Sequence, residues 1–362
     1  MASKEWPSET PAMKAARIRA HGGLDAIEWC EIPRPSPSAG EVLVELRTSG
    51  INSLDTWVRR GVPGHNFPLP LTLGADGAGV VRKVGDGVSE VKVGDEVILS
   101  PGVSCGHCSS CLSGLDHYCR HYHILGEGRD GTCAEYVVVP AVNTVARPPE
   151  LSWEESGALA LVALTAWGML VDRAKIQPGE EVLVIAGGSG VGSMGIQIAK
   201  LYGCRVMATA GGEDKCARLG DLGADEVIDH SREDIAARVR ELTHKRGVDV
   251  VFEHVGEATW SASLQSLARG GRLVTCGATT GAMVECNLRM IFFKKLSILG
   301  STMGPKGMLA KLVRFAALKR LRTVVGRRLP ASEVQEAHRL LEERQVFGKV
   351  VLIRELSKEE SS

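Results

Sequence analysis

The sequence has no excess of either charge. Its 43 lysine and arginine residues balance 43 aspartate and glutamate residues, so the formal net charge at pH 7 is zero. A neutral chain provides no long-range field for gripping nucleic acid or an anionic membrane surface. We therefore expect a small molecule as the partner of this protein, and neither nucleic acid nor a membrane.

The sequence also lacks a long apolar run and an internal repeat. No window has the length and purity of a transmembrane span, and residues 1–11 are polar, so we expect no secretory signal and a cytoplasmic location. The ten cysteines would then lie in a reducing compartment, where clustered thiols bind metal more often than they form disulfides.

A chain of 362 residues is long enough for two domains. Its first 150 residues contain short apolar segments bounded by glycine and aspartate turns, a pattern typical of a β-rich barrel or sandwich. The clearest strand candidates in this part are residues 41–47, 80–87, 91–99 and 136–140.

From about residue 152 the pattern changes to alternating strands and helices. Six short β-branched strands with helical crossovers predict a parallel sheet covered on both faces. The predicted strands are residues 181–186, 205–209, 226–229, 248–253, 272–276 and 296–300, with helices such as 192–201 and 233–245 between them. The last part of the chain predicts helices over 306–321 and 331–344 and a final strand over 348–353.

A glycine fingerprint follows the first strand of this second part and opens a helix. Gly190 permits a tight turn, Gly192 lets the backbone approach a pyrophosphate, and Gly195 lets the helix pack on the strand. The phosphates would bind the unpaired N–H groups at the helix N-terminus. A glycine-rich turn without a ligand is the alternative. The residues expected to bind the cofactor are Gly188, Gly190, Val191, Gly192, Gly195, Lys215, Gly277 and Lys349.

The end of the second strand indicates which cofactor is bound. An NAD site usually places an acidic residue there for the ribose 2′-hydroxyl, but residues 208–212 are small and neutral. Lys215 and Arg218 follow, and both suit a 2′-phosphate. Glu213 and Asp214 are expected to face solvent at a helix start, where acidic residues suit the helix dipole. The sequence therefore favours NADPH.

Four cysteines lie close together: Cys105, Cys108, Cys111 and Cys119. Their short spacing lets four thiolates converge on one tetrahedral Zn²⁺, which would leave no coordination position for water or substrate. We therefore expect one structural zinc per chain. Disulfides, an iron–sulfur cluster and unligated core cysteines are the alternatives, and the spacing of the fourth cysteine does not fit a bacterial ferredoxin motif. The nearby histidines and the six scattered cysteines are interpreted as loop and core residues.

Taken together, these features resemble the medium-chain dehydrogenase/reductase superfamily over nearly the whole chain. Further supporting motifs lie at residues 73–79, 93–97, 130–136, 164–167 and 348–351. The resemblance implies an α/β protein with a GroES-like β-rich catalytic domain and a Rossmann domain with a doubly wound, parallel, six-stranded sheet. The catalytic domain would comprise residues 1–151 and 303–362, with a zinc lobe at about 101–123, and the Rossmann domain residues 152–302. A homodimer with Rossmann sheets paired edge to edge is the family's common assembly.

Three departures separate this chain from the zinc alcohol dehydrogenase branch. Where that branch supplies the ligands of a catalytic zinc, this sequence has Asn52, Ala75 and Leu161. None of these side chains replaces cysteine or histidine as a zinc ligand. The stretch around Asn52 is more similar to the quinone oxidoreductase, or zeta-crystallin-like, branch. That branch often has a tyrosine where this chain has Trp57, and an indole cannot donate a proton near neutral pH.

The resemblance implies an NADPH-dependent reductase that transfers a hydride to a quinone or to the activated C=C bond of an enone, enal or enoyl compound, without catalytic zinc. Asn52 is the candidate that holds the substrate carbonyl or orients the nicotinamide, and Thr165 is expected beside the nicotinamide or its ribose. The proton would come from water, or else from Asp55, His65 or Glu127. We expect Trp57 to form a wall of the pocket for flat or apolar substrates. A zinc-type alcohol dehydrogenase and a non-catalytic NADPH-binding protein are the alternative functions.

Overall fold

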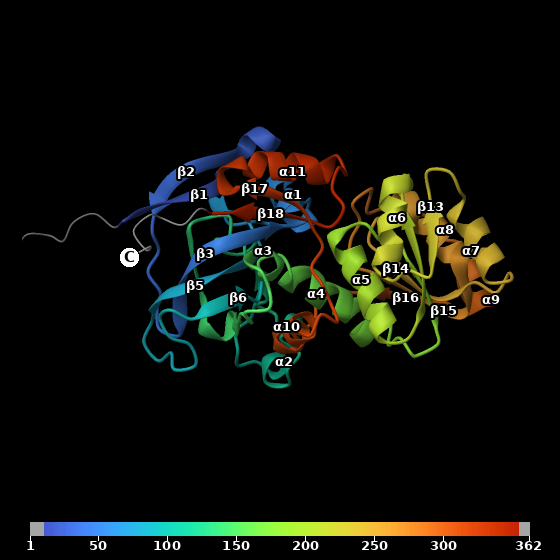
Figure 1. Ribbon diagram of the computed structural model, residues 1–362, viewed down its shortest axis with the longest axis horizontal. Coiled ribbons are helices and arrows are strands. Elements are labelled where there is room, and N and C mark those ends of the chain that lie inside the picture. The colour runs from blue at the N-terminus through green and yellow to red at the C-terminus, as the bar shows by residue number, and fades with distance from the viewer. Residues whose placement is uncertain (1–10, 355–362) are drawn as a thin grey trace, which may run out of the picture.

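Two large β-sheets organise the part of the chain that the computed structural model describes, residues 11–354. Figure 1 shows them side by side, with the N-terminal and C-terminal segments together on one side and the middle of the chain on the other. Helices α4 (Ala160–Trp167) and α5 (Gly190–Leu201) lie between the two halves and pack on each other.

The first sheet has the order β10-β6-β5-β3-β18-β17, and β9 also pairs with β3. Its central strand β3 (Glu41–Ile51) is long and buries apolar side chains along most of its length. The C-terminal strand β18 (Lys349–Ile353) is antiparallel to β3, and Val350 lies opposite Ile51. The remaining strands are β5 (Asp76–Val84), β6 (Glu96–Leu99), β9 (Tyr136–Pro140), β10 (Thr144–Ala146) and β17 (Val325–Pro330). The end of the chain thus returns to the sheet formed by its beginning.

Smaller elements surround this sheet. A three-stranded sheet consists of β1 (Ala12–Ile18), β2 (Ile27–Pro33) and β4 (Leu71–Thr72), and a hairpin pairs β7 (Gly102–Val103) with β8 (His123–Ile124). The helices on this side are α1 (Ser53–Arg60), α2 (Ser109–Leu112), α3 (Trp153–Ser156), α10 (Leu309–Ala317) and α11 (Val334–Glu342). Sequence patterns did not predict β1, β2 or α1.

The second sheet is entirely parallel, with the order β13-β12-β11-β14-β15-β16. The chain reverses direction across the sheet between β11 and β14, which is the switch point where open α/β sheets bind ligands. This arrangement confirms the expected doubly wound six-stranded sheet. Its strands are β11 (Glu181–Val184), β12 (Arg205–Ala210), β13 (Glu226–Asp229), β14 (Val248–Glu253), β15 (Leu267–Thr275) and β16 (Ser297–Gly300).

Both faces of this sheet are apolar because successive side chains point to opposite sides. On β11, Val182 and Val184 join the core beneath α4 and α5, whereas Leu183 joins the core on the opposite face. That second face is covered by α7 (Ile235–Leu242) and α8 (Glu257–Ser266). The helices α6 (Glu213–Asp221) and α9 (Leu288–Lys294) complete this half.

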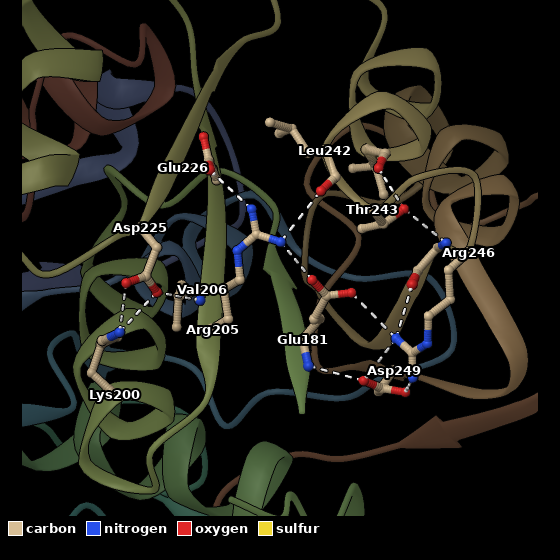
Figure 2. Close-up of polar contacts among 12 residues, drawn as sticks. Glu181, Lys200, Arg205, Val206, Asp225, Glu226, Leu242, Thr243, Arg246 and Asp249 are labelled. Carbon is tan, nitrogen blue, oxygen red and sulfur yellow. Dashed lines mark hydrogen bonds and ion pairs between the residues drawn. The ribbon is translucent and has the colours of Figure 1, made fainter. Parts of the chain in front are cut away.

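The amino ends of the parallel strands are joined by an ion-pair network, shown in Figure 2. Arg205, at the start of β12, contacts Glu181 at 2.7 Å and Glu226 at 2.9 Å, which are the first residues of β11 and β13, the two strands beside β12. Arg246 pairs with both Glu181 and Asp249. The network leaves the carboxyl ends of the strands, at the opposite edge, available for a ligand.

Several predicted elements are shorter in the structure. The segment 91–99 forms a strand only from Glu96, because a turn with Gly94 at φ 94° precedes it. The helix predicted over 233–245 begins at Ile235, because the Asp234 side chain accepts the Ala237 N–H as an N-cap. Within residues 11–354, no helix is long and apolar enough to cross a membrane. The boundaries of the two domains stay a prediction.

Candidate functional site

A cavity of about 1060 Å³ lies where the two halves meet. This volume is slightly above the range typical of pockets for small ligands, about 300 to 1,000 Å³. It extends from the carboxyl ends of β11 and β12 to α1 and β18. The structure brings most of the sequence-predicted residues to its wall: Asn52, Thr165, Gly188, Gly190, Val191, Lys215, Gly277 and Lys349.

Gly192 and Gly195 are not among the lining residues and have packing roles within α5. A Cβ at Gly192 would lie 2.4 Å from the Ala186 carbonyl oxygen, so the turn itself excludes any side chain there. A Cβ at Gly195 would lie 3.2 Å from the ring of Phe252 on β14, which agrees with close packing of helix and strand. The Ser189 side chain caps α5 by accepting the Gly192 N–H at 2.9 Å.

The glycine turn is in direct contact with β18 of the other sheet. The Gly348 N–H donates to the Gly188 carbonyl at 2.7 Å. Gly348 has φ 85°, and a Cβ there would lie 2.2 Å from the Val324 carbonyl oxygen. A Cβ at Gly190 would meet the aliphatic stem of Lys349 at 2.8 Å. A side chain at position 190 would therefore displace the Lys349 stem that crosses the turn.

The Lys349 ammonium ends in a buried polar cluster with Asn52 and Asp76. It donates to the Asn52 Oδ1 and, at 3.0 Å, to the Asp76 Oδ2. The Asn52 amide group donates to the Gly50 carbonyl at 3.2 Å and to the Asp76 Oδ2 at 3.1 Å. An ammonium can only donate, so it fixes which end of the amide is oxygen. Both amide hydrogens of Asn52 are thus engaged, and sequence reasoning did not foresee this.

Asp55 lies beside this cluster and closes a capping box at the start of α1. Its Oδ2 accepts the Asn52 N–H at 2.7 Å, and its Oδ1 has no hydrogen-bond partner. Complete burial raises the pKa of Asp55 to about 7, although the Asn52 N–H and the Lys349 charge act in the opposite direction. The carboxyl group therefore meets the burial condition for a proton reservoir, but Asp55 does not line the cavity.

The remaining candidate residues, Trp57, His65, Glu127 and Thr165, also line the cavity. Trp57 lies over Gly277, where a Cβ would be 3.5 Å from the indole. His65 and Glu127 approach to 3.7 Å, and burial raises the pKa of the Glu127 carboxyl. Thr165 is buried on α4 and contributes to the same wall.

At the other end of the cavity, Lys215 meets two groups that the sequence did not indicate. The Lys215 ammonium donates to the Arg344 carbonyl at 2.6 Å, and Arg344 and His230 line the same wall near Gly211. Burial lowers the pKa of His230; the Asp229 charge acts in the opposite direction, and the charges of Arg344 and Lys215 lower the pKa further. Arg218 instead stacks on Phe347 at 4.0 Å. Glu213 and Asp214 are exposed at the start of α6, as predicted.

The four predicted cysteines converge in the lobe between β7 and β8. Their sulfur atoms all lie within 4.8 Å of one another, and neighbouring pairs are 3.5 to 3.9 Å apart. A tetrahedron of sulfur ligands around zinc has edges of about 3.8 Å. Among residues 11–354, no other group of three or more histidine, cysteine or acidic side chains is arranged to hold a metal. The donor set fits a structural zinc.

The zinc-binding dehydrogenase family matches residues 190–318, and the alcohol dehydrogenase GroES-like domain matches residues 38–149. The chain is 30% identical to an NAD-dependent alcohol dehydrogenase of Saccharolobus solfataricus over 94% of this chain and all of the relative. It is 28% identical to a human quinone oxidoreductase, and the alignment covers 94% of this chain and 98% of the relative.

A crystal structure of an NAD-dependent alcohol dehydrogenase superposes with a TM-score of 0.91 at 48% identity, covering 94% of this chain and 99% of the other. The similarity thus spans both sheets, the glycine turn and the segment with the four cysteines. From this coverage and the order of its domains, the chain belongs to the medium-chain dehydrogenase/reductase superfamily and is an oxidoreductase.

Proposed function

We propose that this oxidoreductase is an NADPH-dependent reductase that acts on the activated C=C bond of an enone, enal or enoyl compound, or on a quinone. The observation that carries the proposal is the composition of the reaction end of the cavity. Asn52, Asp76 and Lys349 meet there, so a substrate carbonyl would be polarised by hydrogen bonding. An activated alkene or quinone needs less polarisation than a simple ketone, which favours it as substrate.

The cavity fits a nicotinamide dinucleotide. The N-terminus of α5 at Gly188, Gly190 and Val191 would bind the pyrophosphate, and Gly277 and Thr165 would lie near the nicotinamide ribose. When bound, the nicotinamide supplies a hydride. The chain would hold the substrate near Trp57, which lines the cavity together with Asn52 and Lys349.

The preference for NADPH rests on the wall around Gly211. Lys215 and Arg344 provide positive charge there, and neutral His230 provides a further hydrogen-bonding group. The strand tip at residues 208–212 has no carboxylate for a ribose 2′-hydroxyl. Two relatives are named NAD-dependent. Comparing the Kd of NADPH with that of NADH tests this choice, and tighter binding of NADH would contradict it.

One screen tests the reaction itself. We expect the wild type to oxidise NADPH with quinones, enals, enones or enoyl thioesters and to contain one zinc per chain. The 48% identity to an NAD-dependent alcohol dehydrogenase makes alcohol oxidation the second candidate function. Two zinc ions per chain, together with chelator-sensitive oxidation of alcohols, would favour that candidate. Cofactor binding without turnover of either class would favour a non-catalytic role.

We also propose a structural zinc on Cys105, Cys108, Cys111 and Cys119, a cytoplasmic location and a homodimer. The dimer is supported by exposed apolar side chains at the β16 edge of the parallel sheet, including Leu288, Phe292, Phe293 and Ile298. A patch of this kind next to an edge strand is typical of a protein interface.

A further inference from the structure

The Lys349 side chain connects the cofactor turn with the reaction end of the cavity. Its stem packs against Gly190, and its ammonium reaches Asn52 and Asp76. The side chain is 3% exposed and Asp76 is fully buried. A buried ion pair is costly to desolvate and is weak evidence for a role in stability alone.

The hydrogen-bonding capacity of this cluster is unevenly used. Both amide hydrogens of Asn52 are donated in hydrogen bonds, one to the Gly50 carbonyl and one to the Asp76 carboxylate. The Asp76 carboxylate only accepts, and it takes the Leu161 N–H at 2.7 Å on its other oxygen. The Lys349 ammonium has three N–H donors, and its two acceptors are the Asn52 Oδ1 and the Asp76 Oδ2. Of the three side chains, Lys349 alone retains a donor, and it lines the cavity.

We infer that the Lys349 ammonium is the group that hydrogen-bonds the substrate carbonyl and protonates the reduced substrate, whereas Asn52 is a positioning residue. This inference rests on the proposed reductase function and deepens it. Asn52 and Asp76 hold the ammonium at a fixed point, and the remaining N–H is directed to the oxygen on which negative charge develops.

The step balances as follows for an enone. When a hydride from NADPH has bonded to the β-carbon, the C=C π pair becomes the enolate electron pair. One N–H bond of Lys349 breaks and the proton bonds to the enolate oxygen or α-carbon, which leaves a neutral amine. The amine regains a proton from water that enters the cavity, which Lys349 lines. The sum is enone, NADPH and one proton giving ketone and NADP⁺.

A cofactor-free binding experiment tests the donor role without turnover. The probe is 4-nitrophenol, whose phenolate mimics an enolate and whose absorbance reports ionisation. We expect the wild type to bind the phenolate in preference to the neutral phenol, and Lys349→Met to weaken phenolate binding by about 10- to 100-fold. Lys349→Arg keeps a charged donor and should retain most of this affinity. The control Lys200→Met removes a surface lysine that pairs with Asp225, and should bind like the wild type.

Turnover provides the second readout. Lys349→Met and Lys349→Arg should both lower kcat for enone reduction by about 10²- to 10⁴-fold, because a guanidinium does not release a proton at neutral pH. Loss of kcat in Lys349→Arg with retained phenolate binding separates proton donation from charge alone. If Lys349→Met does not fold, kcat and phenolate binding of Lys349→Arg test the proton-donor role of Lys349.

The two proposals fail in different ways. If Lys349→Met binds phenolate and reduces enones like the wild type, or if the wild type shows no preference for phenolate, Lys349 is not the donor, while the reductase function stands. If phenolate binding depends on Lys349 but the wild type reduces no enone, enal, enoyl compound or quinone, the reductase function fails, while the oxygen-binding role of Lys349 stands.

Discussion

At the scale of single residues, Asp55 illustrates how burial sets chemistry. The carboxyl group is fully buried, and its pKa rises from the ordinary value of 3.8 to about 7. A raised carboxyl pKa means that the folded protein resists ionisation that the unfolded chain undergoes freely. Stability attributable to Asp55 is therefore greatest below about pH 4 and falls as the pH rises toward 7.

We expect Asp55→Asn to remove this fall in stability. Asparagine still accepts the Asn52 N–H and carries no charge. The free energy of unfolding of the variant, relative to that of the wild type, should therefore increase by roughly 1 to 3 kcal/mol from pH 5 to pH 8. Urea unfolding at both pH values measures the difference. Effects of pH on zinc binding are common to both proteins and cancel in the comparison. If the free energy of unfolding depends on pH in the same way in both proteins, Asp55 does not cause the fall in stability.

Arg344 and Lys215 allow a second prediction at this scale. Arg344→Ala and Lys215→Ala should each weaken NADPH binding by about 10-fold or more, because a charge-assisted contact to a phosphate is lost. Binding of NADH, which lacks the 2′-phosphate, should change by less than threefold or so. Parallel titrations with both cofactors measure the two affinities. An equal loss of affinity for NADH would show that these residues do not bind the 2′-phosphate.

The residue scale also marks the limit of sequence reasoning. Cys105 and its three partners were predictable because they lie near one another in the chain and only one geometry suits four thiolates. The hydrogen bonds of the Asn52 amide group were not predictable, because their partners Asp76 and Lys349 are far away in sequence. No periodicity or motif records a contact between such distant positions. The role of Asn52 in the reaction stays a prediction.

At the scale of elements, α5 and the glycine turn were predicted well, and the structure adds a second reason for one glycine. Gly192 was expected to make room for a pyrophosphate, which stays a prediction, and a Cβ there would in addition strike the Ala186 carbonyl within the turn. The strand–glycine–helix pattern is local and therefore readable from sequence. The strand β1 and helix α1 lack such a signature, and their positions depend on packing against distant segments.

Gly192→Ala should therefore disrupt the turn even without cofactor. We expect a loss of roughly 1 to 3 kcal/mol in the free energy of unfolding, together with weaker NADPH binding. The matched control is Gly220→Ala in α6, where an added Cβ meets nothing within 4 Å. That variant should be neutral or slightly more stable, since alanine favours helix. Similar losses in both variants would refute the steric explanation.

The lobe between β7 and β8 is the second element with a testable property. It is joined to the C-terminal part of the chain by Asp116, which accepts the Lys306 N–H at 3.0 Å. The end of the lobe also reaches the cavity through Ile124 and Glu127. A metal that fixes the lobe would thus also support part of the substrate wall.

Cys111→Ser should remove the zinc and lower the melting temperature by several degrees, because metal binding to a preformed site contributes directly to stability. Metal analysis and thermal unfolding measure both effects. The exposed Cys286, converted to serine, provides the control and should keep its zinc. A zinc-free wild type with the same melting temperature as the metal-loaded protein would rule out a structural role.

At the scale of the whole molecule, the parallel sheet ends at an open edge. Phe292 and Phe293 are more than half exposed near β16, and Figure 1 places α9 at the far end of the molecule from the first sheet. Pairing two such edges would bury these rings and the unpaired backbone groups of β16.

We expect the wild type to be a dimer in light scattering, and Phe292→Asp to shift it toward the monomer. The variant changes a side chain outside the cavity, so cofactor binding per chain should be retained if each subunit holds a complete site. Leu318→Asp, an exposed apolar position on the other half, is the control and should remain a dimer. A monomeric wild type would refute the proposed assembly.

The hydrogen bond between Gly348 and Gly188 has a consequence for how the protein is made. The Gly188 carbonyl of the glycine turn accepts a hydrogen bond from Gly348, which directly precedes β18. The ribosome synthesises this segment long after the turn itself. All six strands of the parallel sheet precede residue 301, so they are synthesised before the segment that makes this contact with the glycine turn. We therefore expect the glycine turn to gain its last backbone partner only when β18 pairs with β3 and the Lys349 stem packs against Gly190.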